Sequence, residues 1–381
     1  MMQRQRKKMM VFFLGMLILV VAAIAVSYKT LTGYTSFSAF SKVLILLVLT
    51  VSWFSPMWLR WVRNGSEFLN GTFYDIAYKL GYFMMGFVLI LTMMLILRDV
   101  LWYVVYFISR IKALNPDNAH AINVANLITV LLALMASFYG VYEAHKTPDV
   151  RQINISDNRI KEPLKLVMAS DFHINQSTPV WHIQKMINII NKQNPDYILL
   201  VGDIVDDEPE RTIEKFKMLE ALKAKKIYIS LGNHEFYHKP YAWMIEFNNL
   251  GFEVLHNTGE KIENTGVYVG GVPDVGSTSV NYDKAFYEAG ETYKILLSHA
   301  PTDFKDIDKT KFDIQLSGHT HGGQIFPFQY ITKRANDGYL AGLYETDDAD
   351  LFVSRGAGYW GPPMRILAEP DIAVLNLEPS K

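Results

Sequence analysis

The sequence predicts a membrane-anchored α/β protein, in which an all-α transmembrane region of about four helices precedes an α/β domain of two packed sheets. Long apolar runs crowd the first 145 or so residues, and after them short apolar segments alternate with amphipathic ones. We therefore expect residues 1–145 to form a multi-pass anchor, 146–162 a juxtamembrane linker and 163–381 a second domain.

The length, net charge and amino-acid composition of the chain exclude several classes of function and of binding site. A chain of 381 residues has room for about two domains. Its net charge of −1 predicts no nucleic-acid partner. The absence of cysteine excludes disulfides, thiolate nucleophiles and cysteine-based metal sites. The composition does not indicate an oligomeric state.

Four uncharged apolar runs predict the membrane spans. They are Met9–Val26, Val43–Leu59, Leu80–Leu97 and Ile122–Val141. Each approaches the ~20 residues that a helix needs to cross a bilayer. Basic residues ahead of the first run favour a retained signal anchor. The apolar stretch Leu101–Arg110 would span only ~15 Å as a helix, so we expect an interfacial extension and not a fifth crossing.

Charge flanking the runs predicts the orientation of the chain. With four spans, the loops on the same face of the membrane as the N-terminus carry about twice as many Lys and Arg residues as the loops on the opposite face. This places the N-terminus and the second domain in the cytoplasm, at the cell (inner) membrane; a fifth crossing would invert the prediction for the second domain. Because the runs carry no charge, we expect an anchor and not a transporter. Polar side chains such as Asn126 and Thr129 should form hydrogen bonds between helices.

The second domain alternates strands with helices. Strands are expected at Leu164–Ser170, Tyr197–Val201 and Lys226–Leu231, with helices at Val180–Gln193 and Arg211–Lys225. This order predicts βαβ units and a largely parallel sheet. The later strand-like segments, which resemble a meander, are Phe252–His256, Gly266–Gly271, Tyr293–Leu297, Asp350–Ser354 and Ile372–Leu377. A mixed α/β domain with two packed sheets accommodates both patterns.

Polar residues that can bind metal follow five of the apolar strands. In chain order they are Asp171, His173, Asp203, Asn233, His234, His299, His319 and His321. The carboxyl ends of strands in an α/β sheet are where sites form. Mixed carboxylate, amide and imidazole ligands suit divalent Mn, Fe, Zn or Ni better than Mg or Ca. Two ions would need one bridging carboxylate, for which Asp203 is the natural candidate.

The ordered set resembles the calcineurin-like metallophosphoesterase superfamily. Its pattern of D-x-H, G-D, G-N-H-[DE], a lone His and G-H-x-H is met in order between Asp171 and His321. Gly-Gly-Gln after His321 and the run Trp360–Arg365 resemble the membrane-associated branch, similar to YkuE and to transmembrane proteins with a metallophosphoesterase domain. The resemblance covers about Leu164 to Leu377 and implies a double β-sheet sandwich flanked by helices.

The resemblance also implies two divalent metal ions and a role for each site residue. One ion would be held by Asp171, His173, Asp203 and His321. The other would be held by Asp203, Asn233, His299 and His319. His234 would bind no metal and would act as the general acid. The implied enzyme is a metal-dependent phosphoric ester or anhydride hydrolase of the phosphodiesterase type.

A short linker and flanking aromatic residues predict a membrane-proximal or lipid-linked phosphoester substrate and the lipid bilayer as partner. The aromatic residues are Phe236, Tyr237, Tyr241, Trp243, Phe326, Phe328 and Tyr330. One example is a molecule like UDP-2,3-diacylglucosamine of the lipid A pathway, which similar enzymes cleave. Alternatives are a phosphodiesterase for soluble nucleotides or cell-envelope polymers, and a non-catalytic membrane sensor with a metal-binding domain.

The remaining polar residues have simpler predicted roles. We expect His182 to be solvated on its amphipathic helix. We expect Asp206, Asp207 and Glu208 to cap the following helix and not to bind metal. His238 could contact a substrate phosphate or lie on the surface. Gly322 and Gly323 are interpreted as allowing the backbone to approach a substrate phosphate.

Overall fold

The computed structural model describes residues 2–65, 72–111, 115, 118–274 and 280–380, and it divides into two compact units. The first unit comprises Met1–Tyr139 with Gly361–Pro363, and the second comprises Gly140–Trp360 with Met364–Lys381. The side chains of residues 4–8, on which the predicted orientation partly depends, lie outside what the structure describes.

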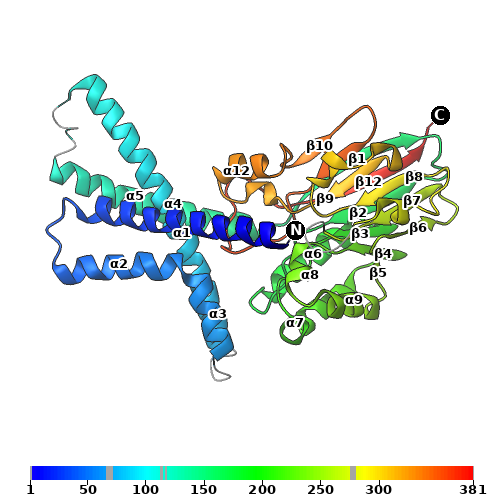
Figure 1. The fold of residues 1–381 in the computed structure, drawn as a ribbon, viewed down its shortest axis with the longest axis horizontal. Helices are drawn as coiled ribbons and strands as arrows, with labels where there is room; N and C mark the ends of the chain where they lie inside the picture. Colours follow the sequence, from blue (N-terminus) through cyan, green and yellow to red (C-terminus); the bar gives the residue numbers. More distant parts are fainter. Residues whose placement is uncertain (1, 66–71, 112–114, 116–117, 275–279, 381) are drawn as a thin grey trace. The chain divides into compact units, whose positions relative to one another are not determined.

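The first unit is helical (Figure 1). Its helices are α1 (Met2–Thr32), α2 (Ala39–Trp53), α3 (Ser55–Gly65), α4 (Thr72–Ser109) and most of α5 (Ala119–His145). Three of them, α1, α4 and α5, are long and apolar enough to cross a membrane. A fourth span exists only if α2 and α3, bent by 71°, count as one. The apolar run predicted at Val43–Leu59 is therefore divided between these two helices.

Helix α4 runs past the predicted span and takes in the segment that begins at Leu101. That segment is not a separate helix. Arg98 lies inside α4, where it pairs with Asp99 (Nη2 to Oδ1, 2.5 Å) and donates to Asn126 Oδ1 of α5 (2.7 Å). Asn126 donates to Thr30 O (2.9 Å), so the predicted bond between helices is present there. Thr129 instead donates within α5, to Ala125 O.

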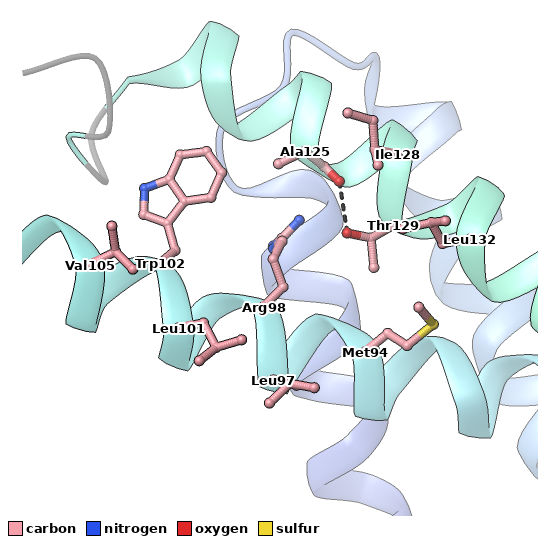
Figure 2. Close-up of a pocket in the computed structure, with 10 residues that line it drawn as sticks. All are labelled: Met94, Leu97, Arg98, Leu101, Trp102, Val105, Ala125, Ile128, Thr129 and Leu132. Atoms are coloured by element: carbon pink, nitrogen blue, oxygen red, sulfur yellow. Dashed lines mark hydrogen bonds between the residues drawn. The ribbon is translucent and has the colours of Figure 1, made fainter. Parts of the chain in front are cut away.

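Between α4 and α5 lies a groove of about 490 Å³ (Figure 2). Its walls are Met94, Leu97, Arg98, Leu101, Trp102, Val105, Ala125, Ile128, Thr129 and Leu132. The guanidinium of Arg98 is held by Asp99 and Asn126, and the remaining lining is almost entirely apolar. The groove therefore suits a hydrocarbon chain better than a polar solute.

The second unit contains two six-stranded sheets. The first has the order β1-β12-β2-β3-β4-β5 and is parallel except where β12 meets β2. Its strands are β1 (Asp149–Asp157), β12 (Asp371–Pro379), β2 (Leu164–Ala169), β3 (Tyr197–Val201), β4 (Lys226–Ser230) and β5 (Glu253–Val254). Strand β1 falls inside the stretch expected as a linker, so this part of the chain is a paired strand.

The second sheet has the order β10-β11-β9-β8-β7-β6. Its strands are β10 (Gly342–Tyr344), β11 (Asp350–Val353), β9 (Ile314–Ser317), β8 (Tyr293–Leu297), β7 (Val267–Gly271) and β6 (Thr258–Ile262). The four central strands are parallel, and only the outer strands pair antiparallel. The predicted meander is therefore wrong, whereas the predicted pair of packed sheets is confirmed.

Alternation along the strands builds three apolar layers. In β2, Leu166 and Met168 face the second sheet, whereas Val167 and Ala169 face the helices. Helices α6 (Val180–Lys192), α7 (Pro209–Phe216) and α9 (Pro240–Asn249) cover the outer face of the first sheet. A third cluster lies on the outer face of the second sheet, around Leu296, Phe304 and Leu351. Both faces of each sheet are thus buried, which fixes the strand register.

The last turn of α5 belongs to the second unit and packs on α6. The His145 ring lies 5.2 Å from Trp181 and 5.1 Å from His182, between centroids, and Lys185 Nζ donates to His145 O (2.6 Å). His182 is only 1% exposed, and among the described residues neither of its ring nitrogens has a hydrogen-bond partner. The prediction that His182 is solvated is wrong, because α5 covers the helix face on which it lies.

The buried His182 should make the protein acid-sensitive. Burial, with help from His145 and Lys185, lowers the pKa of His182 to about 3. Below the unfolded pKa of about 6.5 the unfolded chain binds the proton more tightly. Stability from this site is complete above that pH and falls by about 1.4 kcal/mol per pH unit toward the folded pKa. Replacing His182 by Phe should remove this slope.

The measurement is thermal unfolding of the full chain in detergent between neutral pH and about one unit below the unfolded pKa of histidine. His182→Phe should flatten the dependence of Tm on pH, and His120→Phe, at an exposed position, should not. Identical pH profiles for wild type and His182→Phe would contradict the prediction.

Candidate metal centre

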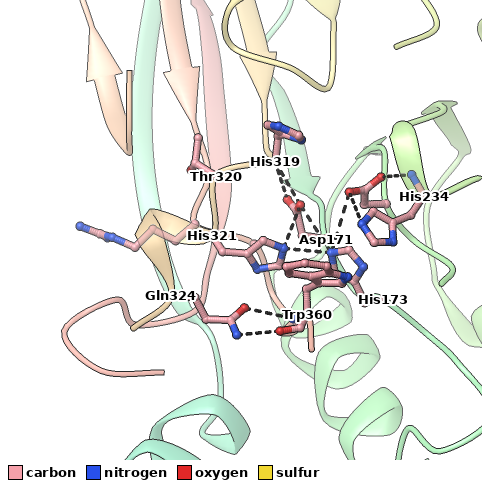
Figure 3. A network of polar contacts seen from close by, with 12 residues as sticks. Asp171, His173, His234, His319, Thr320, His321, Gln324 and Trp360 are labelled. Atoms are coloured by element: carbon pink, nitrogen blue, oxygen red, sulfur yellow. Dashed lines mark hydrogen bonds and ion pairs between the residues drawn. The ribbon is translucent and has the colours of Figure 1, made fainter. Parts of the chain in front are cut away.

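The eight predicted site residues lie at the carboxyl ends of five strands and come together. Figure 3 shows five of them, Asp171, His173, His234, His319 and His321. The turns after β2 and β3 are linked, because Asp171 N donates to Gly202 O (3.1 Å) and His173 N to Asp203 O (3.0 Å). In the second sheet, Gly318 N donates to His299 O (3.0 Å). Helix α8 (Asn233–Tyr237) starts directly after β4 and presents Asn233 and His234.

The backbone turns sharply at most of these residues. Five have a positive φ: Asp171 (55°), His173 (49°), Asp203 (54°), His319 (71°) and His321 (49°). This left-handed region costs residues other than glycine roughly 1–2 kcal/mol each. The surrounding packing must therefore hold these turns in place.

The glycines ahead of three of the ligands are required by space. A Cβ on Gly202 would meet His299 Nδ1 at 2.6 Å. On Gly232 it would meet Asp203 Oδ1, and on Gly318 it would meet Asp171 Oδ2, both closer than 3.0 Å. The glycines of the G-D, G-N-H and G-H motifs thus leave room for ligand side chains.

The first group of ligand atoms is formed by Asp171, His173 and His321. The Nε2 atoms of the two histidines face each other at 2.9 Å. Asp171 Oδ1 lies 3.4 Å from His321 Nε2 and 3.9 Å from His173 Nε2. Facing nitrogens beside a carboxylate form a donor set for a divalent ion.

The second group is formed by Asp203, His299 and His319. Asp203 Oδ2 lies 3.0 Å from His299 Nε2, and His319 Nδ1 lies 2.9 Å from Asn233 Oδ1. The same Asp203 oxygen is 3.9 Å from His173 Nε2 in the first group. Asp203 therefore lies between the groups, as a bridging carboxylate must.

Burial keeps three of the imidazoles in the form that binds metal. It is the main cause that lowers the pKa of His173, to about 3, and it also lowers the pKa of His319 and His321. Neutral imidazole is the metal-binding form. Burial has the same effect on His299, but Asp203 and Asp171 outweigh it and raise the pKa of His299. A hydrogen bond between Nδ1 of His299 and Val201 O (2.8 Å) fixes the ring, so that Nε2 faces those carboxylates.

His234 differs from the other histidines of the site. Burial alone would lower its pKa, but Asp206, 2.5 Å from Nδ1, raises the pKa to about 9. The imidazole is then a cation at neutral pH and can donate a proton. Its Nε2 lies 4.0 Å from Asp203 Oδ2, and its backbone N–H donates to Asp203 Oδ1 (2.9 Å).

The sequence analysis missed Asp206 as a site residue. Of the three acidic residues predicted to cap the following helix, only Glu208 lies at the N-cap of α7, whereas Asp206 pairs with His234. His238 Nε2 lies 3.5 Å from Asp206 Oδ1, at the edge of the site. The only signal in the sequence was the position of Asp206, shortly after the Gly-Asp motif.

Two further buried charges support the ligand turns. Glu235 accepts from the backbone N–H groups of Asp203 (2.9 Å), Ile204 (2.7 Å), Val205 (3.0 Å) and Gly232 (2.8 Å). This one carboxylate fixes the turn that carries Asp203. Arg365, fully buried, donates to the backbone oxygens of His321 (3.2 Å) and Gly358 (2.6 Å). Burial lowers the pKa of Arg365 to about 10, which still leaves it charged at neutral pH.

The glycines after His321 are explained by packing inside the protein. A Cβ on Gly323 would meet the backbone of Gln329 closer than 3.0 Å, and one on Gly322 would touch Arg355 at 3.0 Å. Both glycines also have positive φ, 60° and 79°. These contacts require glycine at both positions, and the approach of the backbone to a substrate phosphate stays a prediction.

Aromatic residues border the site, but not all of those predicted. Trp243 is buried, with Nε1 donating to Asp207 O (3.0 Å), and Phe236 packs against the core. Tyr237 is 69% exposed and its ring lies 5.3 Å from His234. Trp360, not predicted, is 53% exposed and lies 5.9 Å from His234, where it exchanges two hydrogen bonds with Gln324 (Figure 3).

Adding one methyl group at Gly318 should weaken metal binding. The Cβ of Gly318→Ala would displace Asp171 Oδ2, and a displaced ligand or support costs metal affinity about 10- to 100-fold. The control is Gly338→Ala, which has positive φ (97°) but open space around its Cβ. Metal content, measured on purified protein by mass spectrometry, should fall in the first variant only. Equal content in both variants would refute the steric role.

Comparisons with known proteins agree with this geometry. Residues 164–323 match the family model described as calcineurin-like phosphoesterase. An uncharacterized metallophosphoesterase of Campylobacter jejuni is 29% identical over 97% of this chain and 98% of its own length. The uncharacterized metallophosphoesterase YkuE of Bacillus subtilis is 30% identical over 63% of this chain and 90% of its own. A transmembrane protein with metallophosphoesterase domain from Danio rerio is 29% identical over 67% of this chain and 62% of its own length. The chain belongs to the calcineurin-like metallophosphoesterase family.

Proposed function

We propose that the protein is a membrane-anchored, dinuclear-metal phosphodiesterase that hydrolyses phosphodiester or pyrophosphate bonds in a membrane-proximal or lipid-linked substrate. The observation that carries the proposal is the division among the imidazoles. The imidazoles of His173, His299 and His321 turn Nε2 toward Asp171 or Asp203. The imidazole of His234 is instead held through Nδ1 by Asp206 and lies beside Asp203. A hydrolase needs both kinds, one for metal and one for the leaving group.

Two divalent ions fit the ligand groups. Asp171, His173, Asp203 and His321 would hold one ion, and Asp203, Asn233, His299 and His319 the other. The donor types favour Mn, Fe, Zn or Ni. When bound, such a pair activates water for attack and neutralises charge on the phosphoryl oxygens.

The protein's own part in the reaction is to orient the substrate and supply a proton. His234 would give the proton on Nε2 to the departing oxygen, because Nδ1 is occupied by Asp206. Asp206 acts as a positioning residue, since it fixes the ring and keeps it charged. Glu235 and Arg365 hold the turns of Asp203 and His321, so the ligands need little rearrangement when substrate binds.

The aromatic border supports a substrate with an apolar part. Tyr237 and Trp360 are both exposed and both lie beside His234, where a leaving group would be. A nucleotide linked to an acylated sugar, such as UDP-2,3-diacylglucosamine of the lipid A pathway, is one molecule of this kind. A soluble nucleotide or a cell-envelope polymer is the alternative substrate class, and a non-catalytic membrane sensor is the alternative function.

For location, we propose a multi-pass protein of the cell (inner) membrane with the metal centre on the cytoplasmic face. The three helices of membrane-spanning length and the relatives named as transmembrane proteins support membrane association. The expected partners are the lipid bilayer and a phosphoester substrate. We expect no nucleic-acid partner.

Turnover tests the proposal directly. The full chain in detergent, supplied with Mn, Fe, Ni or Zn, should hydrolyse bis-p-nitrophenyl phosphate. His234→Gln should lower kcat roughly 100- to 10,000-fold while metal is retained, since the bond to Asp203 comes from the backbone of His234. Wild-type activity should fall above about pH 9, where His234 loses its proton, and Asp206→Asn should move that fall to lower pH. Absence of turnover in metal-loaded protein would favour the sensor.

A comparison of cellular lipids tests the substrate class. Cells that lack the protein should accumulate one phosphorylated lipid relative to wild type, as measured by mass spectrometry of lipid extracts. Complementation with the wild-type gene should remove that species, and complementation with His234→Gln should not. Accumulation of a water-soluble nucleotide, with lipids unchanged, would favour the alternative substrate class.

A further inference from the structure

Helix α12 (Phe328–Ala335) is unusual in the second unit because none of its residues is buried. Most surface helices cover a core with an apolar stripe. Here the large apolar side chains point outward, with Tyr330 69% and Ile331 65% exposed, and Phe326 just ahead of the helix 42% exposed. Lys333 and Arg334 are exposed in its last turn.

A second segment extends this exposed surface. Ile366 pairs with Ile325 in a parallel bridge, and Phe326 N donates to Ile366 O (3.1 Å). The next residue, Leu367, is 60% exposed, and Trp360 on the same loop is 53% exposed. We call these five exposed residues the apolar rim: Phe326, Tyr330, Ile331, Trp360 and Leu367. Since scattered single residues need no explanation but contiguous ones do, the rim calls for a partner.

The rim is fastened to the end of an apolar helix. Arg365 N donates to Gly140 O (2.9 Å), and a Cβ on Gly140 would meet Met364 at 3.1 Å and Ile366 at 3.4 Å. Gly140 lies in the last turns of α5, one of the helices long and apolar enough to span a membrane. Phe326 and Leu367 therefore adjoin the segment that contacts the last turns of this helix.

We propose that α12 and the apolar rim lie in the interface of a bilayer containing anionic lipid. Aromatic and aliphatic side chains beside basic ones are the composition of helices that rest in the headgroup region. Lys333 and Arg334 would meet acidic headgroups, each contributing about 1 kcal/mol near such a surface. The occupant is therefore lipid and not a second copy of the chain. A second copy of this same surface would offer no acidic side chains to pair with Lys333 and Arg334.

The consequence concerns access to the metal centre. The N-terminal part of α12 packs directly on Gly323, two residues after His321, and Trp360 of the rim lies 5.9 Å from His234. A rim seated in the interface would bring the mouth of the site to the level of the headgroups. The inference itself does not depend on hydrolysis, because it concerns where the surface lies and not what the site does.

The absence of cysteine makes the test direct. The full chain is reconstituted in vesicles of phosphatidylcholine and phosphatidylglycerol, with a single bimane-labelled cysteine at Ile331→Cys. The matched control is Tyr287→Cys, an aromatic position 86% exposed and outside the rim. Lipids brominated in the acyl chains should quench the label at 331 several-fold more than the label at 287. Metal content equal to wild type verifies the fold of each variant.

Two outcomes would overturn the proposal. Equal, weak quenching at both positions would show that α12 does not reach the bilayer. Disulfide crosslinking between the unlabelled 331 cysteines of two copies, with no quenching, would assign the rim to a dimer contact. The preference for anionic lipid is tested with K333E/R334E. Quenching at residue 331 should be stronger in vesicles that contain phosphatidylglycerol than in phosphatidylcholine alone, and K333E/R334E should abolish this difference. An unchanged difference would refute the anionic preference.

Discussion

The carboxylate of Asp203 is the group on which both halves of the site depend. One oxygen accepts the backbone N–H of His234, and the other lies 3.0 Å from His299 and 3.9 Å from His173. Its own turn is held by Glu235, another fully buried carboxylate. Burial opposes such a concentration of negative charge, so the fold tolerates it only with cationic partners nearby. The charged form of His234 and the divalent ions that the ligand groups fit meet this condition.

Much of the site could be predicted because parallel strands end at a common edge, so that polar residues after apolar strands converge whatever the loops do. The roles of the supporting residues could not be predicted from the sequence. Asp206, Glu235 and Arg365 act on partners that are 28 to 44 positions away in the chain. Period-two patterns do not distinguish parallel from antiparallel pairing, which explains the mistaken meander. Strand β1 is a polar edge strand and α12 has no buried face, so neither gave a signal. The break before Ser55 did give a signal, because Pro56 is tolerated in the first turn of a helix but not in its interior.

The ligand turns combine local strain with external support. Five ligands adopt a backbone conformation that costs free energy, and the neighbouring glycines have no room for a side chain. Glu235 stabilises the Asp203 turn, and Arg365 stabilises the His321 turn. The result is a rigid donor set whose geometry depends on residues that never touch a ligand atom of the opposite group. A search restricted to the ligand residues would miss this support, although it is what positions them.

The membership of Gly140–His145 in the second unit bears on how the protein can be cut. A fragment that starts after the apolar helix, at residue 146, would lack the Gly140 carbonyl bound by Arg365 and the His145 ring that covers His182. Water would then reach a histidine that folding keeps neutral, and the loop behind His321 would lose an anchor point. Soluble versions for crystallisation should therefore retain a stub of α5, with its 68% exposed Tyr142 exchanged for a polar residue.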